Sequence, residues 1–67
     1  MPEHVITLQP GEHALYQLRI WLEDDGGRPR WRASVKPPHE EQRRVFTSPD
    51  ALLRYLESCL SAVEPSV

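Results

Sequence analysis

The first half of the chain shows a strict alternation of apolar and polar side chains. From residue 16 to residue 22 every second side chain is apolar, in the order Tyr16, Leu18, Ile20 and Leu22. A period of two predicts a strand with one buried face. Residues 30–35 repeat the alternation, and the intervening Asp24-Asp25-Gly26-Gly27 tolerates the positive φ of a tight turn. The two segments therefore predict an antiparallel hairpin.

One register of this hairpin matches side chains by kind on both faces. It pairs Leu22 with Trp31, Ile20 with Ala33 and Leu18 with Val35, and on the opposite face Glu23 with Arg30 and Trp21 with Arg32. A slip by two positions would set Arg19 against Arg32, and facing like charges destabilise a sheet. We therefore expect the first register.

A third strand and a helix are predicted in the second half. The polar, proline-containing residues 36–41 lead to a short strand over residues 42–47, in which either Val45 or Phe46 points to the core, because adjacent apolar residues leave the period open. Ser48-Pro49-Asp50 is typical of a helix start, since serine caps free N–H groups and proline fits the first helical position. Apolar residues follow at helical spacing, namely Leu52, Leu53, Leu56, Cys59, Leu60 and Val63, and Pro65 ends the predicted helix.

These elements predict an α+β fold, a three-stranded antiparallel sheet with one C-terminal helix packed on one face. Residues 1–13 form an N-terminal arm or an edge strand around Val5–Leu8, residues 14–64 a single β-β-β-α domain, and residues 65–67 a tail. The expected core consists of Leu18, Ile20, Trp31, Phe46, Leu52, Leu56 and Leu60.

Length and composition agree with one small folded domain. The chain has 67 residues, of which 39% are hydrophobic and 27% charged, so it can pack a core, although a limited one. Cys59 is the only cysteine, and no apolar run approaches the ~20 residues that span a bilayer. The N-terminus also lacks the pattern of a signal peptide. We therefore expect a cytoplasmic protein.

Basic residues gather in one part of a chain whose net charge is -2. Between residues 28 and 44 six basic residues stand against two acidic ones, a local charge of +4. These six are the candidate nucleic-acid-binding residues: Arg28, Arg30, Arg32, Lys36, Arg43 and Arg44. The alternative interpretation is a solvated strand face.

One helix covers only one face of such a sheet, so the opposite face stays open. It would carry Trp21 among arginines, and Trp and Arg are enriched at binding hot spots. The candidate protein interface is Arg19, Trp21, Arg30 and Arg32. Alternatively, Trp21 simply lies against the aliphatic stems of its arginine neighbours. Because self-association would stabilise so small a core, a homodimer is the first partner expected.

Nothing in the sequence predicts catalysis, a cofactor, a metal site or a small-molecule substrate. His4, His13 and His39 match no metal or triad spacing and are expected at the surface. Cys59 lies at an apolar helical position and is expected in the core. Gly26-Gly27 is followed by no helix, so it indicates a turn and not a phosphate loop.

Three segments carry a family resemblance: Arg19-Ile20-Trp21, Trp31-Arg32-Ala33-Ser34-Val35, and Phe46-Thr47-Ser48 with Leu52-Leu53 and Tyr55-Leu56. Over residues 16–60 the chain resembles short uncharacterised bacterial proteins with a strand-strand-strand-helix plan, a group that implies a fold and no activity. In outline it is also similar to the arm-type DNA-binding domains of tyrosine recombinases, a resemblance that implies DNA contacts by Arg30, Arg32, Lys36 and Arg43. Antitoxins of the partial ribonuclease-H-like type share the element order but not the Pro-Gly-Cys segment, so their function is not transferred.

The sequence thus favours a small cytoplasmic protein-binding or regulatory module that acts through its open sheet face and self-associates. The alternative hypothesis is a nucleic-acid-binding domain that uses residues 28–44.

Overall fold

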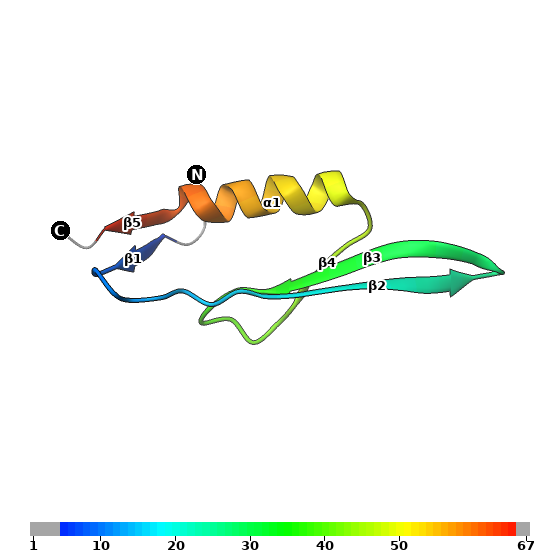
Figure 1. The fold of residues 1–67 in the computed structure, drawn as a ribbon, viewed down its shortest axis with the longest axis horizontal. Coiled ribbons are helices and arrows are strands. Elements are labelled where there is room, and N and C mark those ends of the chain that lie inside the picture. The colour runs from blue at the N-terminus through cyan, green and yellow to red at the C-terminus, as the bar shows by residue number, and fades with distance from the viewer. Residues whose placement is uncertain (1–4, 66–67) are drawn as a thin grey trace.

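The computed structural model describes residues 5–65 and confirms the α+β fold class. Strands β2, β3 and β4 form an antiparallel sheet in that order, and a single helix, α1, packs on one of its faces (Figure 1). Within residues 5–65 the elements are β1 (Ile6–Leu8), β2 (Gln17–Asp25), β3 (Arg28–Lys36), β4 (Arg44–Phe46), α1 (Pro49–Ser61) and β5 (Val63–Pro65).

The hairpin of β2 and β3 has the predicted register. Leu22 pairs with Trp31, and the pairing continues without interruption from Gln17–Lys36 to Asp25–Arg28. Gly26 and Gly27 form the two-residue turn with φ of 63° and 85°. Positive φ at both positions is the requirement of a type I′ turn, whose twist matches that of the strands. This turn therefore fixes the register.

On the third strand Phe46 faces the core, and Val45 does not. Phe46 pairs with Ala33 and is partly buried, with its ring centroid 5.1 Å from that of Tyr55 on α1. Val45 projects from the opposite face and is exposed. The Ser48 cap is confirmed, because its Oγ accepts a hydrogen bond of 3.2 Å from the backbone N–H of Ala51.

The C-terminal boundary of the helix was predicted wrongly. Instead of continuing through Val63, α1 ends at Ser61, and Val63–Pro65 form strand β5. The physical reason is Pro65, whose ring would clash with the carbonyl four residues earlier, that of Ser61, and which favours extended backbone at Glu64.

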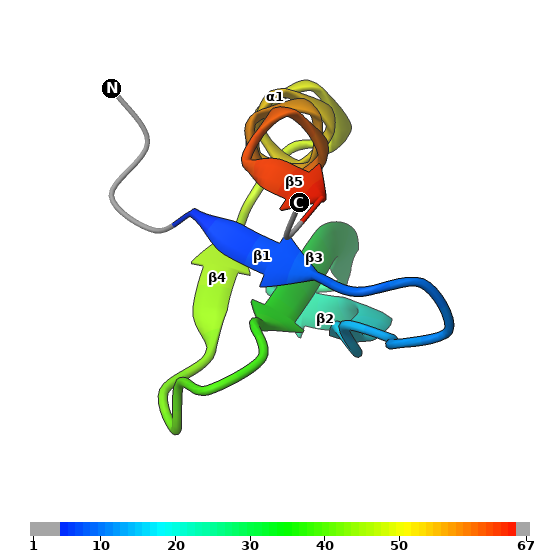
Figure 2. The same ribbon diagram turned by 90° about the vertical axis from the view of Figure 1, so that its left-hand side faces the viewer.

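The N-terminal run predicted as a strand or an arm is a strand, but it does not join the main sheet. Strand β1 pairs in parallel with β5, with Ile6 opposite Val63, and the N–H of Ile6 donates to the carbonyl of Ala62 at 2.9 Å. The two short strands lie together at the C-terminal end of α1 (Figures 1 and 2). Strand β1 therefore lies at the far end of the molecule from the hairpin turn (Figure 1).

The core is smaller than predicted. Ala33, Val35 and Leu52 are its buried centre, and partly buried neighbours surround them: Tyr16, Trp31, Phe46, Tyr55 and Leu56. The prediction was wrong for three residues, which are largely exposed: Leu18 at 48%, Ile20 at 58% and Leu60 at 74%. Helix α1 lies over β3 and β4 and leaves the edge strand β2 without a cover (Figure 2).

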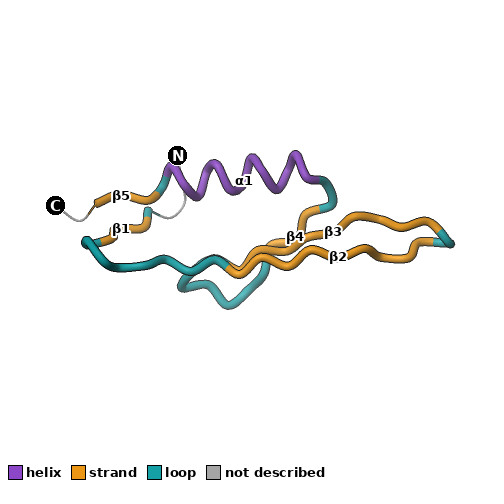
Figure 3. Tube along the Cα trace, in the orientation of Figure 1, coloured by secondary structure: helices purple, strands orange, loops and turns teal. Residues whose placement is uncertain are grey.

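The molecule is elongated for its size. Its extents are 52 × 20 × 17 Å, and its radius of gyration is 14.5 Å, whereas a compact domain of this length has about 11 Å. Much of the length comes from the hairpin, which extends well past the N-terminal end of α1 (Figures 1 and 3). The distal half of the hairpin is therefore not covered by the helix.

Candidate interaction surface

The hairpin presents two different surfaces, which we call the outer face and the apolar surface. The outer face points away from α1 and carries the odd-numbered residues of β2, from Gln17 to Glu23, and the even-numbered residues of β3, from Arg30 to Ser34. The apolar surface lies on the helix side of β2. Both follow from the alternation of side chains along a strand.

On the outer face, Trp21 and Arg32 share one acidic partner. The indole N–H of Trp21 donates to Oε1 of Glu23 at 3.2 Å, and Nε of Arg32 lies 3.7 Å from the same oxygen. Trp21 is 37% exposed. The predicted interface residues Trp21 and Arg32 are thus brought together, in an arrangement that Glu23 already organises.

The other two predicted interface residues lie on either side of this cluster. Arg19 is exposed and pairs with Ser34 in the register, while Arg30 lies toward the turn, where its Nε donates to Oδ2 of Asp25 at 3.3 Å. The Asp25–Arg30 pair is largely exposed, so it contributes little to stability.

Arg43, on the loop before β4, crosses the sheet instead of facing solvent. Its Nε donates to Oγ of Ser34 at 2.7 Å, and its Nη2 donates to the carbonyls of Gln17 at 2.9 Å and Ser34 at 3.3 Å. Ser34 is only 4% exposed. One guanidinium group therefore links β2 and β3 to the start of β4, which is a structural role that the sequence pattern did not reveal.

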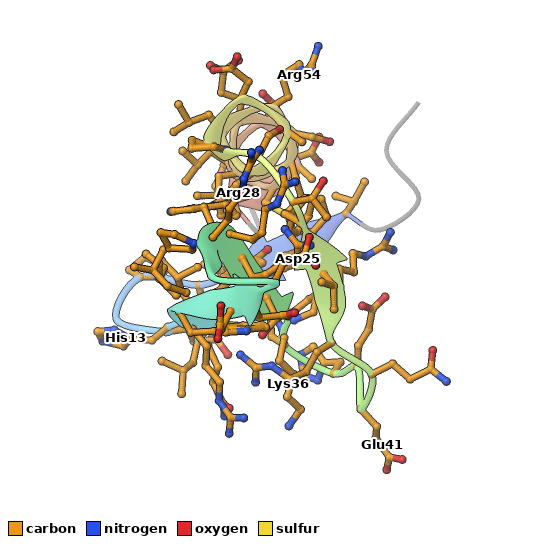
Figure 4. All side chains as sticks on the ribbon, turned by 90° about the vertical axis from the view of Figure 1, so that its right-hand side faces the viewer. His13, Asp25, Arg28, Lys36, Glu41 and Arg54 are labelled. Atoms are coloured by element: carbon orange, nitrogen blue, oxygen red, sulfur yellow. The ribbon has the colours of Figure 1, made fainter. Side chains whose placement is uncertain are left out.

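The other predicted nucleic-acid-binding residues do not form one patch with Arg43. The guanidinium carbon of Arg44 lies 5.4 Å from the centre of the Tyr55 ring, and its Nη2 is 4.0 Å from Oε1 of Glu40. Arg28 and Lys36 stand at opposite ends of β3 and extend in different directions (Figure 4). The basic segment is thus continuous in sequence but divided in space.

The apolar surface was not predicted as a site, because its residues were assigned to the core. On β2 it comprises Leu18, Ile20 and Leu22, all of them at least 48% exposed. These side chains project on the face of the sheet that carries Ala33 and Val35, since each pairs with a residue of that face. They therefore lie beside the core and extend it toward the free edge of the sheet.

Helix α1 carries two further exposed leucines, Leu53 and Leu60. Tyr55 marks the flank of the helix that faces β4, because its ring contacts Phe46. At 100° per residue, Leu53 and Leu60 lie roughly 140° or more around the axis from Tyr55. Both are exposed, on a different flank of the helix from Tyr55. The signal in the sequence was the width of the helical apolar stripe, which exceeds what a small sheet can cover.

No group of three or more His, Cys, Asp or Glu side chains within residues 5–65 is placed to hold a metal ion. His13 and His39 are exposed as expected, and His4 lies outside the described residues. An open hollow of about 430 Å³ is lined by the loop residues 40–44, which have charges of both signs.

Cys59 was predicted in the core. It is half-buried, so the prediction holds only in part. Burial and a hydrogen bond with Cys59 raise the pKa of Tyr55 to about 12. The pKa of Tyr16 is raised as well, chiefly by burial. Both phenols therefore stay neutral near pH 7 and act as packing groups.

No family model matches this sequence, and searches of curated proteins and of solved structures likewise found no match. Within the described part of the chain, no helix is long and apolar enough to cross a membrane.

Proposed function

We propose that this protein is a small interaction module that binds other proteins through the open surfaces of its β2–β3 hairpin, with a second copy of itself as the first partner. The observation that carries the proposal is the apolar surface. Leu18, Ile20 and Leu22 line one uncovered strand, and α1 carries two more exposed leucines, Leu53 and Leu60. Contiguous exposed apolar side chains rimmed by polar residues are typical of interaction sites.

The total surface area supports association. The chain exposes 5521 Å², about 1,100 Å² more than a compact monomer of its mass would expose. A standard protein interface buries about 800 Å² per partner. The excess is thus large enough to supply a complete interface, and burying it would stabilise a domain whose own buried core is small.

The outer face supports the proposal as a second contact region. Trp21 retains more than a third of its surface, and the hydrogen bond to Glu23 holds its indole in place. A fixed aromatic side chain loses little conformational freedom on binding, which is one reason why such residues anchor interfaces.

Sedimentation velocity over a wide range of protein concentrations tests the proposal. We expect a monomer–dimer equilibrium that Ile20→Lys shifts to monomer, because a charge would have to be desolvated in the interface. Val5→Lys is the matched control, since Val5 is a similarly exposed apolar residue next to β1 and outside the hairpin. Circular dichroism would confirm that both variants fold.

The outcomes show whether the apolar surface or the outer face forms the contact. Loss of association with Trp21→Ala but not with Ile20→Lys would assign the contact to the outer face. A wild-type protein that stays monomeric at every concentration and captures duplex or single-stranded nucleic acid at low salt would contradict the proposal and favour the nucleic-acid hypothesis.

A further inference from the structure

Strand β2 is a free edge of the main sheet. It pairs with β3 on one side, and within residues 5–65 no strand pairs with its other side. The strand is nine residues long, and a long unpaired edge is a template for another strand. An exposed edge beside exposed leucines therefore favours a partner that pairs with the free backbone groups of β2 and also covers its leucines.

The turn determines which backbone groups are free. In a two-residue hairpin loop the closing residues, here Asp25 and Arg28, form a hydrogen-bonded pair. The direction of the backbone groups then alternates along the strand, so the odd residues of β2 bond to β3. The N–H and C=O groups of Leu18, Ile20 and Leu22 consequently point to the free edge.

We infer that a second copy of this chain joins at this edge, with the two β2 strands antiparallel and Ile20 on the two-fold axis. This inference rests on the proposed function and specifies its geometry. In this register Ile20 faces Ile20 of the other copy and Leu18 faces Leu22. The backbone groups that point to the free edge come directly opposite one another, as an antiparallel ladder requires.

The outer face is complementary in the same register. Arg19 faces Trp21 of the second copy, which allows a cation–π contact, and is diagonal both to Glu23 and to Arg19 of that copy. Gln17 faces Glu23. No two like charges are directly opposite along the paired segment from Gln17 to Glu23.

Neighbouring registers that keep the hydrogen bonds are less favourable. Centring the axis on Arg19 sets two arginines directly against each other, which is destabilising. Centring it on Trp21 sets Leu18 against Asp24, so that a carboxylate lies among the leucines. The register centred on Ile20 avoids both penalties.

The dimer would form one continuous sheet in the order β4-β3-β2-β2-β3-β4. A two-fold axis perpendicular to the sheet places both helices on the same face. The apolar side chains of the two β2 strands would then form a single strip between the helices. The uncovered apolar surface becomes the centre of the assembly.

Symmetric disulfide formation tests the register in a Cys59→Ala background. Ile20→Cys should give a covalent dimer under mild oxidation, since facing Cα atoms in this pair would be about 5.5 Å apart. Leu22→Cys is the matched control. Its two copies would be separated by four residues along the strand, about 14 Å, and should not link. If Ile20→Cys fails to fold, the double variant Leu18→Cys/Leu22→Cys should link instead, because these positions face each other.

The outcomes distinguish the geometry from the proposed function. A doubled mass in sedimentation together with linking at residue 20 and not at residue 22 would support the inference. A doubled mass with no link at residue 20, or with efficient linking at residue 22 alone, would overturn this geometry and leave self-association intact. A monomer at every concentration would contradict both.

Discussion

Replacing Arg43 by methionine should destabilise the fold far more than a surface arginine substitution normally does. Methionine keeps most of the length of the side chain and removes the guanidinium. The hydroxyl of Ser34, which is 4% exposed, would lose its donor at 2.7 Å, and the carbonyls of Gln17 and Ser34 would lose theirs. The change therefore removes one hydrogen bond to a buried hydroxyl and two hydrogen bonds to backbone carbonyls.

The magnitude follows from these contacts. Leaving a buried polar group without its partner costs about 1–3 kcal/mol, and the bonds to the carbonyls add a smaller amount because water replaces them. Freeing the arginine side chain returns up to about 2 kcal/mol of conformational entropy. We expect a net loss of about 2 kcal/mol, which for a domain of this size lowers Tm by about 8–16 °C.

Urea unfolding followed by tryptophan fluorescence, at one fixed protein concentration, measures this loss. Arg54→Met, on the exposed side of α1, is the matched control and should change stability little. A double-mutant cycle with Ser34→Ala should give a coupling energy of about 1 kcal/mol or more. Equal stability of Arg43→Met and Arg54→Met would refute the assignment of Arg43 as a structural link.

Three further predictions concern the helix cap, the turn and the buried phenol. Ser48→Ala should cost about 1 kcal/mol in urea unfolding, because Oγ no longer caps α1; an unchanged midpoint would contradict this. Gly27→Val should cost about 1–2 kcal/mol and Gly26→Asn much less, since asparagine tolerates positive φ; equal losses would speak against a backbone cause. The pKa of Tyr55 is raised to about 12 in the folded protein, so the unfolded chain ionises first, and stability should fall as pH rises from about 10 to 12. Tyr55→Phe should flatten this decline in circular dichroism, and an undiminished decline would assign it to other groups.

Local chemistry in the sequence was sufficient for the three strands of the main sheet, for the start of the helix and for the register of the hairpin. The alternation from Tyr16 to Leu22 and the pair Gly26-Gly27 act over a few residues, and a two-residue turn leaves one register for the flanking strands. The helix start at Ser48 is equally local, because the cap depends on a side chain and a backbone N–H three residues apart. Features of this kind can be read before any tertiary contact is known.

The width of the core depended on where the helix lies across the sheet. Periodicity showed which side chains share the face of Ala33, and it placed Ile20 there correctly. It does not show how many strands one helix can cover. With Tyr55 against Phe46, α1 lies toward β4, and Ile20 stays exposed. The predicted core residues of β2 thus became a candidate interface.

The role of Arg43 and the pairing of the terminal strands also required the three-dimensional structure. Arg43 belongs to a basic run in the sequence, but its partners Gln17 and Ser34 are brought to it only by the assembled sheet. Likewise, β1 and β5 lie at opposite ends of the chain, and nothing in either short segment identifies the other. The sequence by itself determined the strands of the main sheet, the helix that follows them and the alternation within the hairpin, because these depend on neighbouring residues. Only the tertiary structure decided which apolar face is covered and which charges are paired, because both depend on contacts between distant parts of the chain.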